Sequence, residues 1–248
     1  MTTVRDIYNY IDEIAPFASM EEWDNSGLLI GDMDKEVNRV VLCLDAVKST
    51  VDFAIESKAD LIITHHPIIF SAIKSVEKNS NVYKLISNDI SVISAHTSYD
   101  KAQGGINDCL AAILGLTDTV RLDGGFVVAG KLSNPMSIDD FAELVAQALD
   151  CKGIRYTDSE KIIETVAVGG GACSEFVGVA MENADCFVTG DLKYHEMLDA
   201  SEAGFPVISA GHFETENMPF LMLMDRLAEE FKGVEFISAN QTNSVMDI

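Results

Sequence analysis

The stretch ADLIITHHP, residues 59–67, decides the fold. Residues 60–64 form a short, mostly apolar segment rich in β-branched side chains, which is typical of a buried strand. This strand ends in His65, His66 and a proline. Outward from it, residues 39–45 (RVVLCLD) and 91–95 (SVISA) have the same character, and His96 follows the second of them. Segments with helical spacing separate these strands, so the sequence predicts an α/β fold.

Between the strands the pattern predicts helices and loops. Apolar residues recur at helical spacing in residues 4–14, and Gly104 and Gly105 precede a second helical segment, residues 106–116. Ser49 is a candidate cap for a helix with the body VDFAIE. Residues 21–32 are expected to form a loop, and residues 123–131 a hinge.

The second half of the chain repeats the plan of the first. The tetrapeptide VISA precedes a histidine at Val92 and again, with one extra glycine, at Val207. Ala-Asp precedes an apolar strand that ends in threonine at Ala59 and at Ala184. We therefore expect two similar α/β lobes that face each other, residues 1–125 and 126–248. The predicted strands of the second lobe are residues 165–169, 185–189 and 206–210, with a helix over 175–181.

The composition excludes several classes of protein. Acidic residues number 40 against 17 basic ones, and the net charge of -23 opposes binding to nucleic acid. An apolar run long enough to cross a membrane is missing. The five cysteines are scattered and form no CxxC pair, as expected of free thiols in a reducing compartment. These features predict a cytoplasmic protein.

Histidines carry the main functional signal. All five (His65, His66, His96, His195 and His212) are expected at or just after the carboxyl end of a strand. Ligands of open α/β sheets bind at that edge, and neutral imidazole is a common metal ligand. Two adjacent histidines, His65 and His66, suit two metal ions better than one.

Two motifs add carboxylates to the histidines. HTSYD (His96 to Asp100) and HFETE (His212 to Glu216) both place a carboxylate four residues after a histidine. On a helix these two side chains share one face, and a carboxylate can bridge two ions. A mixed His and carboxylate set suits zinc, iron, manganese, cobalt or nickel, and few ligands per ion leave positions open, as in catalytic sites.

Three further features allow two interpretations each. His195, in TGDLKYHE, could act as a general acid or base, or lie on the surface; in the same motif Asp191 occupies the place of His66. The WDNSG loop around Trp23 could line a pocket or form a packed turn. Gly104 and Gly105 could expose a helix N-terminus to an anion, although simple turn chemistry is favoured.

Five segments together resemble the NIF-three-like (NGG-interacting-factor-three-like) family, whose members are often named GTP cyclohydrolase type-two-like proteins. In chain order they are WDNSGLLIG, ITHHPIIF, HTSYDKAQGGINDCLA, TGDLKYHE and GHFETE. The resemblance extends from about Glu22 to Glu216 and fits the short form, which lacks the inserted domain of longer members.

The resemblance implies two divalent metal ions per chain, held in the cleft between two similar lobes, and a ring-shaped homo-hexamer built from dimers. It places His96 near the metals but outside the ligand set. Departures from the family pattern at Ser98, Tyr99 and Phe213 remove no ligand but alter the pocket. The metal ligands that it implies are His65, His66, Asp100, His212 and Glu216, with Glu216 bridging.

Two classes of function follow from these features. A metal-dependent hydrolase would act on a nucleotide-like substrate, by opening a guanine ring or by cleaving a phosphoester, with His96 and His195 moving protons. Lys101 and Lys193 are the best candidates for phosphate contacts. Because the motifs contain no larger basic cluster for a triphosphate, the sequence argues against GTP as the substrate. The alternative is a non-catalytic protein, either a ring-shaped scaffold or a metal-handling protein.

Overall fold

The computed structural model describes residues 1–245 and divides into two compact units. Unit 1 is Met1–Ala102 with Phe220–Thr242, and unit 2 is Gln103–Pro219 with the segment that begins at Asn243. These bounds differ from the predicted lobes 1–125 and 126–248. The reason is long-range pairing: the C-terminal strand β11 (Glu235–Ser238) joins the sheet of unit 1, and helix α5 (Ile106–Ile113) packs on the sheet of unit 2.

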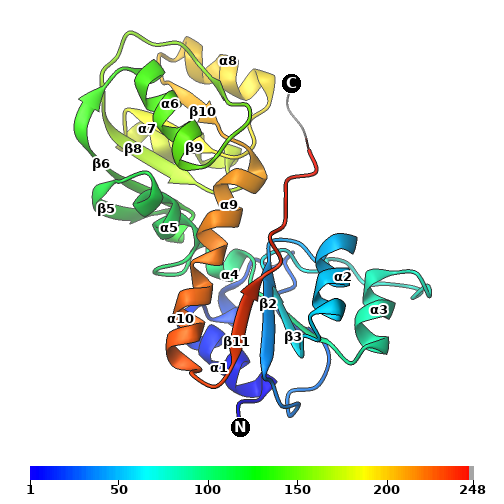
Figure 1. The fold of residues 1–248 in the computed structure, drawn as a ribbon. Coiled ribbons are helices and arrows are strands. Elements are labelled where there is room, and N and C mark those ends of the chain that lie inside the picture. Colours follow the sequence, from blue (N-terminus) through cyan, green and yellow to red (C-terminus); the bar gives the residue numbers. More distant parts are fainter. Residues whose placement is uncertain (246–248) are drawn as a thin grey trace. The chain divides into compact units, whose positions relative to one another are not determined.

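Unit 1 is a five-stranded sheet with helices on both faces (Figure 1). The strand order is β1-β4-β3-β2-β11, and only β1 is antiparallel to its neighbour. The strands are β1 (Gly27–Ile30), β2 (Arg39–Cys43), β3 (Leu61–Thr64), β4 (Ser91–Ser94) and β11. The helices are α1 (Val4–Ile14), α2 (Lys48–Glu56), α3 (Asn81–Ser87), the short α4 (Thr97–Asp100) and α10 (Leu223–Glu230).

Both faces of this sheet are buried, as its continuous apolar strands predict. Val41 and Ile62 belong to one core cluster with Leu85 of α3, so α2 and α3 cover that face. Neighbouring strand residues point to the opposite face, where Val40 and Leu42 are fully buried. Figure 1 shows α1 and α10 on that side of the sheet.

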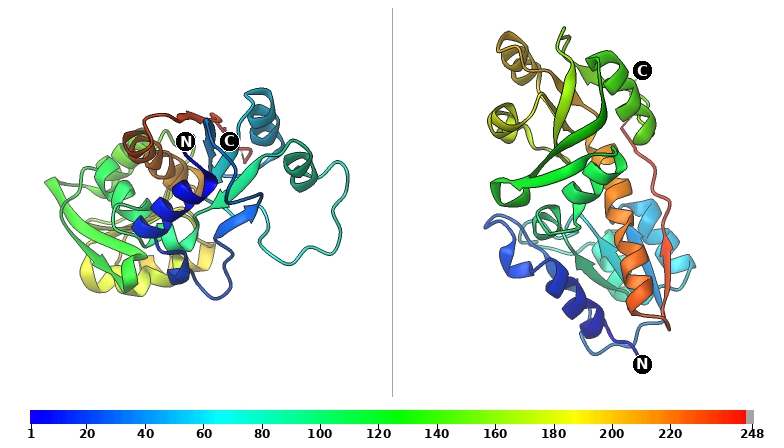
Figure 2. Two further views of the ribbon diagram at one scale, coloured as in Figure 1. Left: turned by 90° about the horizontal axis from the view of Figure 1, so that it is seen from below. Right: turned by 90° about the vertical axis from the view of Figure 1, so that its left-hand side faces the viewer.

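Unit 2 is a six-stranded sheet, with the order β5-β6-β8-β9-β10-β7. Strands β8, β9 and β10 are parallel, and the others are antiparallel to their neighbours. The strands are β5 (Thr117–Leu122), β6 (Val127–Met136), β7 (Arg155–Tyr156), β8 (Ile163–Gly169), β9 (Cys186–Thr189) and β10 (Val207–Ser209). Helices α5 and α6 (Ile138–Ala148) cover one face, while α7 (Val177–Asn183) and α8 (Tyr194–Glu202) cover the other (Figure 2).

The two units repeat one arrangement of strands. The order β1-β4-β3-β2 of unit 1 corresponds to β7-β10-β9-β8 of unit 2, with the same strand directions. The Ala-Asp pairs have equivalent roles: a side-chain oxygen of Asp60 accepts the N–H of Arg39 at 3.1 Å, and one of Asp185 accepts that of Thr165 at 2.9 Å. The prediction of an α/β fold with two similar lobes is confirmed.

Three local predictions were wrong. Residues 21–32 contain strand β1, because Gly27–Ile30 pairs with β4, and the hinge at 123–131 contains the start of β6. Helix α2 begins at Lys48 with Val47 as its cap, so Ser49 lies inside it. Among the described residues no helix is long and apolar enough to cross a membrane. Residues 1–245 also contain three short 3-10 helices: Phe17–Ser19, Asp123–Gly125 and Ser174–Phe176.

Candidate metal centre

Three histidines of unit 1 meet at the carboxyl ends of two neighbouring strands. His65 and His66 follow β3, and His96 follows β4, which pairs with β3 in parallel. The ring centroids lie 5.0 Å apart for His65 and His66, 5.1 Å for His65 and His96, and 5.5 Å for His66 and His96. Each ring offers a nitrogen within 4.8 Å of the others. The parallel register therefore gathers the three rings that the sequence predicted at this edge.

Each of these rings is held by its Nδ1 atom. A backbone carbonyl can only accept a hydrogen bond, so His65 carries a proton on Nδ1, and in the neutral imidazole the lone pair of Nε2 is then available to a ligand. Carboxylates hold the other two rings in the same way, which is the usual support of metal-bound histidines. The pairs are His65 with Ala95 O at 2.8 Å, His66 with Asp45 Oδ1 at 2.7 Å, and His96 with Asp24 Oδ1 at 2.8 Å.

Asp100 adds a carboxylate to the histidines of unit 1. It ends the short helix α4, and its Oδ1 lies 3.3 Å from Nε2 of His65, which is fully buried. The side chain of Asp100 is only 14% exposed. Helix α4 is fixed at its start because Thr97 donates both its N–H and its hydroxyl to Asp24. The predicted ligand Asp100 therefore faces the predicted ligand His65.

Asp24 is a supporting residue that the sequence interpretation did not identify. Burial raises the pKa of its carboxyl, but hydrogen bonds from His96 and Thr97 outweigh burial and hold the pKa well below its usual range. The carboxylate is ionised and orients His96. Asp45 was equally missed, although it ends the predicted strand 39–45 and so stands at the edge where the histidines gather.

The donors of unit 2 lie on one face of a helix. His212 opens helix α9 (His212–Leu221), and Glu216 follows one turn later. Nε2 of His212 lies 3.1 Å from Oε2 of Glu216, while its Nδ1 lies 2.7 Å from Oδ2 of Asp191. The predicted geometry of the HFETE motif is confirmed. Asp191, which follows β9 as His66 follows β3, orients a histidine here.

The charge of His212 depends on these two carboxylates. Burial lowers the pKa of its imidazole, but hydrogen bonds to Asp191 and Glu216 outweigh this effect and raise the pKa to about 10. In the absence of a metal ion, both ring nitrogens of His212 therefore carry a proton at neutral pH. A metal ion that binds Nε2 must displace that proton.

Glycines make room for the donors of unit 2. Gly171 has a φ of +63°, and a Cβ atom there would lie 1.9 Å from Oε1 of Glu216. At Gly190 a Cβ atom would lie 2.7 Å from Cα of His212. Neither position accepts a side chain unless the donors move. These glycines follow β8 and β9, so the ends of the strands are shaped around Glu216 and His212.

The remaining candidates lie apart from the donor sets. His195 is exposed on α8, with its ring 5.3 Å from that of Tyr194, and among the described residues it belongs to no group that could hold a metal ion. Its catalytic role stays a prediction. Lys101 forms an ion pair with Glu21, and Lys193 lies 3.6 Å from Glu196.

The turn at Gly104 and Gly105 follows ordinary turn chemistry. The N–H of Gly104 donates to Oδ2 of Asp108 at 2.6 Å, and the same oxygen lies 3.1 Å from Nη1 of Arg121. A carboxylate of the chain therefore occupies the position that an external anion would take at the start of α5.

The fold and the donors define a class of protein: a two-lobed α/β protein with paired histidines and carboxylates at the carboxyl ends of its parallel strands. The chain belongs to the Duf34/NIF3 (NGG1p interacting factor 3) family, whose sequence profile matches residues 2–244. The resemblance that its motifs carry is thus confirmed.

Relatives and solved structures agree over nearly the whole chain. A Clostridium perfringens protein named "GTP cyclohydrolase 1 type 2 homolog" is 32% identical over 252 residues, which cover 96% of each chain. A protein of the same name from Clostridium acetobutylicum is 34% identical over 240 residues, covering 91% of this chain and 89% of that one. The crystal structure of Staphylococcus aureus hypothetical protein SA1388 superposes with a TM-score of 0.93 at 28% identity, and covers 99% of both chains.

Proposed function

We propose that this protein is a metal-dependent hydrolase that acts on a nucleotide-like substrate. The observation that carries the proposal is the orientation of the histidines. In each unit a carbonyl or carboxylate holds Nδ1, and in both units a carboxylate lies beside an Nε2 atom. The packing of an ordinary core does not require this pattern, whereas metal-bound histidines almost always have their second ring nitrogen held in this way. The names of the relatives support a nucleotide as the substrate.

In this proposal these donors bind two divalent metal ions. Bound ions of this kind lower the pKa of water and stabilise the charge that develops during hydrolysis. The chain's own groups then have distinct roles. His96, which Asp24 orients, would accept or return a proton. The proposed ligands are His65, His66, Asp100, His212 and Glu216.

The reaction within this class is either the opening of a guanine ring or the cleavage of a phosphoester. Both lysines beside the motifs already pair with glutamates. The metal centre itself would therefore have to neutralise a substrate phosphate. The predicted homo-hexamer and the cytoplasmic location remain proposals that accompany this one.

Metal content tests the proposal directly. Wild type is expected to contain about two metal ions per chain by elemental analysis, and His65→Ala and Glu216→Gln should lose most of them. His195→Ala is the matched control, because this histidine is exposed and outside the donor sets, so it should keep its metal.

A nucleotide turnover screen on the same samples separates the two classes of function. Turnover that disappears with the metal supports the hydrolase. Metal that binds fully without any turnover would instead favour a metal-handling protein or a scaffold. Equal metal in wild type and both variants would contradict the metal centre itself.

A further inference from the structure

Two large aromatic side chains are exposed beside the histidines of unit 1. Trp23, the one tryptophan of the chain, is 59% exposed, and Phe70 is 51% exposed. Their ring centroids lie 5.9 Å apart, with the ring planes inclined by 40°. Adjacent exposed aromatic rings mark a surface that contacts a ligand or a partner, because water solvates them poorly. We call this pair the aromatic platform.

Hydrogen bonds on both sides hold the platform in place. Asp24, next to Trp23, is buried and bonded to His96 and Thr97. Asn25 donates from its side-chain amide to the carbonyl of Ile69, the residue before Phe70, at 2.6 Å. The loop of Trp23 and the loop of Phe70 are thus tied to each other and to the histidines. A site held this way loses little conformational entropy when a ligand binds.

The platform borders the metal donors of its own unit. The ring of Trp23 lies edge-on to His96 at 5.9 Å, and that of Phe70 lies edge-on to His96 at 6.3 Å. His96 in turn lies 5.1 Å from His65. His96 therefore neighbours both the platform and the proposed ligand His65.

We propose that Trp23 and Phe70 bind the purine base of the substrate by stacking, and so select a planar heteroaromatic ligand. This inference rests on the proposed function and adds the recognition of the base to it. A ring inserted between two aromatic rings needs them about 7 Å apart, twice a carbon contact distance. The spacing of 5.9 Å is too small, so the base stacks on the outer face of the platform.

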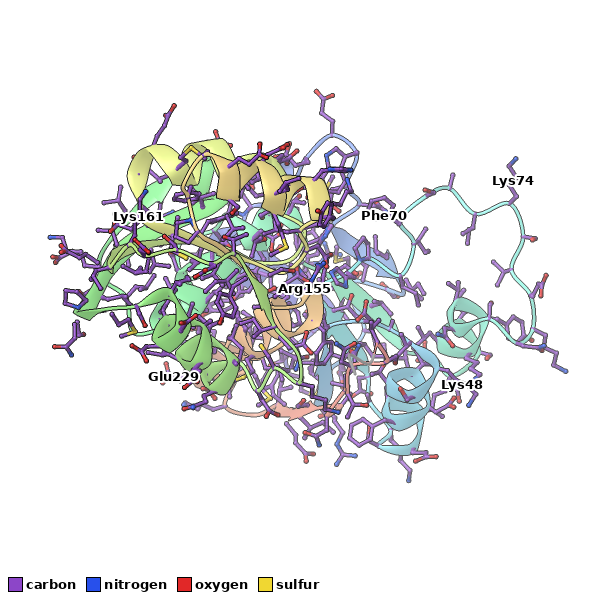
Figure 3. All side chains as sticks on the ribbon, turned by 90° about the horizontal axis from the view of Figure 1, so that it is seen from above. Lys48, Phe70, Lys74, Arg155, Lys161 and Glu229 are labelled. Carbon is purple, nitrogen blue, oxygen red and sulfur yellow. The ribbon has the colours of Figure 1, made fainter. Side chains whose placement is uncertain are left out.

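The loop beyond Phe70 leaves this face accessible. Figure 3 shows the loop running outward from Phe70 to Lys74, away from the body of unit 1. Its apolar residues Ile73 and Val76 are exposed as well, and the two rings themselves remain more than half exposed. The platform is therefore open to a small molecule.

Unit 2 offers an internal comparison site. A cavity of about 520 Å³ lies between β7 and α8, lined by residues that include Arg155, Tyr156, Tyr194 and Leu198. Its aromatic rings and its arginine could also accept a nucleotide, but its lining contains no donor histidine. A substitution at Tyr194 therefore tests whether the nucleotide binds in this cavity instead of on the aromatic platform.

Tryptophan fluorescence reports on the platform directly, because Trp23 is the only emitter of its kind. Guanosine and GMP, added to wild type with and without EDTA, should quench the emission to saturation. Ribose 5-phosphate, which lacks the base, should not. Calorimetric titration of GMP should show binding about 5- to 150-fold weaker for Trp23→Ala, the range of one base–aromatic stack. Trp23→Phe should keep most of the affinity, and all variants should keep their metal content.

Controls give the results that would overturn the proposal. Glu22→Gln in the same loop and Tyr194→Ala in the comparison cavity should bind GMP as wild type does. Binding lost in Tyr194→Ala but kept in Trp23→Ala would refute the platform. Emission that is shielded from acrylamide in the native protein would also refute it, because a second copy of the chain would then cover Trp23.

The same data separate this inference from the proposed hydrolase. Base-dependent quenching without turnover would support base binding at the platform and contradict the hydrolase proposal. Turnover with an unchanged KM in Trp23→Ala would support the hydrolase proposal and contradict base binding at the platform.

Discussion

Four histidines of this chain share one arrangement: a backbone carbonyl or a carboxylate holds Nδ1. For His65 the acceptor is a carbonyl, and for His66, His96 and His212 it is an aspartate. The aspartates tie the rings to loops distant in sequence, so ring orientation does not depend on the histidine's own backbone alone. Replacement of such a supporting group commonly reduces metal affinity by about 10- to 100-fold.

Gly171 gives a prediction at the scale of a single residue. Gly171→Ala should release bound metal, because the new Cβ atom would lie 1.9 Å from Oε1 of Glu216 and displace it, and because the backbone has a positive φ. We expect at least about a 10-fold loss of metal affinity, as for loss of a supporting group. Competition with a chromogenic chelator measures it.

Gly178→Ala is the matched control for this prediction. Gly178 lies in helix α7, where an added Cβ atom would meet no described atom within 4 Å, so this variant should retain full affinity. Its stability should rise by up to about 1 kcal/mol, because alanine favours a helix more than glycine does. Equal affinity in both variants would contradict the role assigned to Gly171.

The sequence predicted the positions of the histidines but not the groups that hold their rings. The positions of His65, His66, His96 and His212 followed from the ends of apolar strands, and the structure brings the first three together. The partners of these rings did not follow, because an aspartate in a loop looks the same in sequence whether it faces solvent or a histidine. With 40 acidic residues in the chain, no pattern distinguished the supporting carboxylates.

At the scale of elements, an aspartate before a strand fastens the strand beside it. In unit 2 Asp185 precedes β9 and accepts hydrogen bonds from the N–H groups of Glu164 and Thr165 and from the Thr165 hydroxyl. Asp60 does the same before β3 with two backbone N–H groups. This is the physical meaning of the repeated Ala-Asp pair.

Asp185 gives a pH-dependent prediction. Burial raises the pKa of its carboxyl, but the hydrogen bonds from Thr165 and Glu164 outweigh burial and lower the pKa below its usual value. A lowered folded-state pKa contributes stability above the unfolded pKa near 4, and that stability is lost as the pH falls through the folded pKa. Asp185→Asn should therefore cost about 1–3 kcal/mol at pH 7, and the difference from wild type should shrink below pH 4.

Urea unfolding at several pH values measures this effect. Asp199→Asn, a substitution on the exposed face of α8, is the control and should follow wild type at every pH. A constant difference between wild type and Asp185→Asn from pH 7 to pH 3 would contradict the assignment.

Elements were predicted well where their cores are continuous. Helix α1 matches its predicted range, and the six predicted strands match within one or two residues at either end. Strands β1, β5, β6, β7 and β11 were missed, because each is short or contains polar and charged residues. Strands β1, β7 and β11 pair only with strands distant in sequence, whereas β6 pairs both with its hairpin neighbour β5 and with the more distant β8.

At the scale of the whole molecule, metal ions should stabilise the folded protein. A ligand that binds only the folded chain adds about 2.7 kcal/mol at a free concentration 100 times its Kd. For a chain of this size that corresponds to a rise in Tm of roughly 5–10 °C. Differential scanning calorimetry with and without EDTA measures the shift.

His65→Ala serves as the reference for that shift. It should lose the stabilisation by metal, whereas His195→Ala should keep it. An EDTA-sensitive Tm in His65→Ala equal to that of wild type would show that the ions bind elsewhere on the acidic surface.

The sequence by itself determined the class of the fold, its internal repeat and the residues able to bind a metal. Apolar strands identify themselves locally, and the edge at which they end follows from chain order. The tertiary structure alone decided which groups face one another. Asp24 meets His96, Asp45 meets His66, and Trp23 lies against Phe70. These pairs are 72, 21 and 47 residues apart. The strand order and the paths of the loops bring these pairs together. Both depend on the burial of the sheets as a whole and not on local sequence preferences.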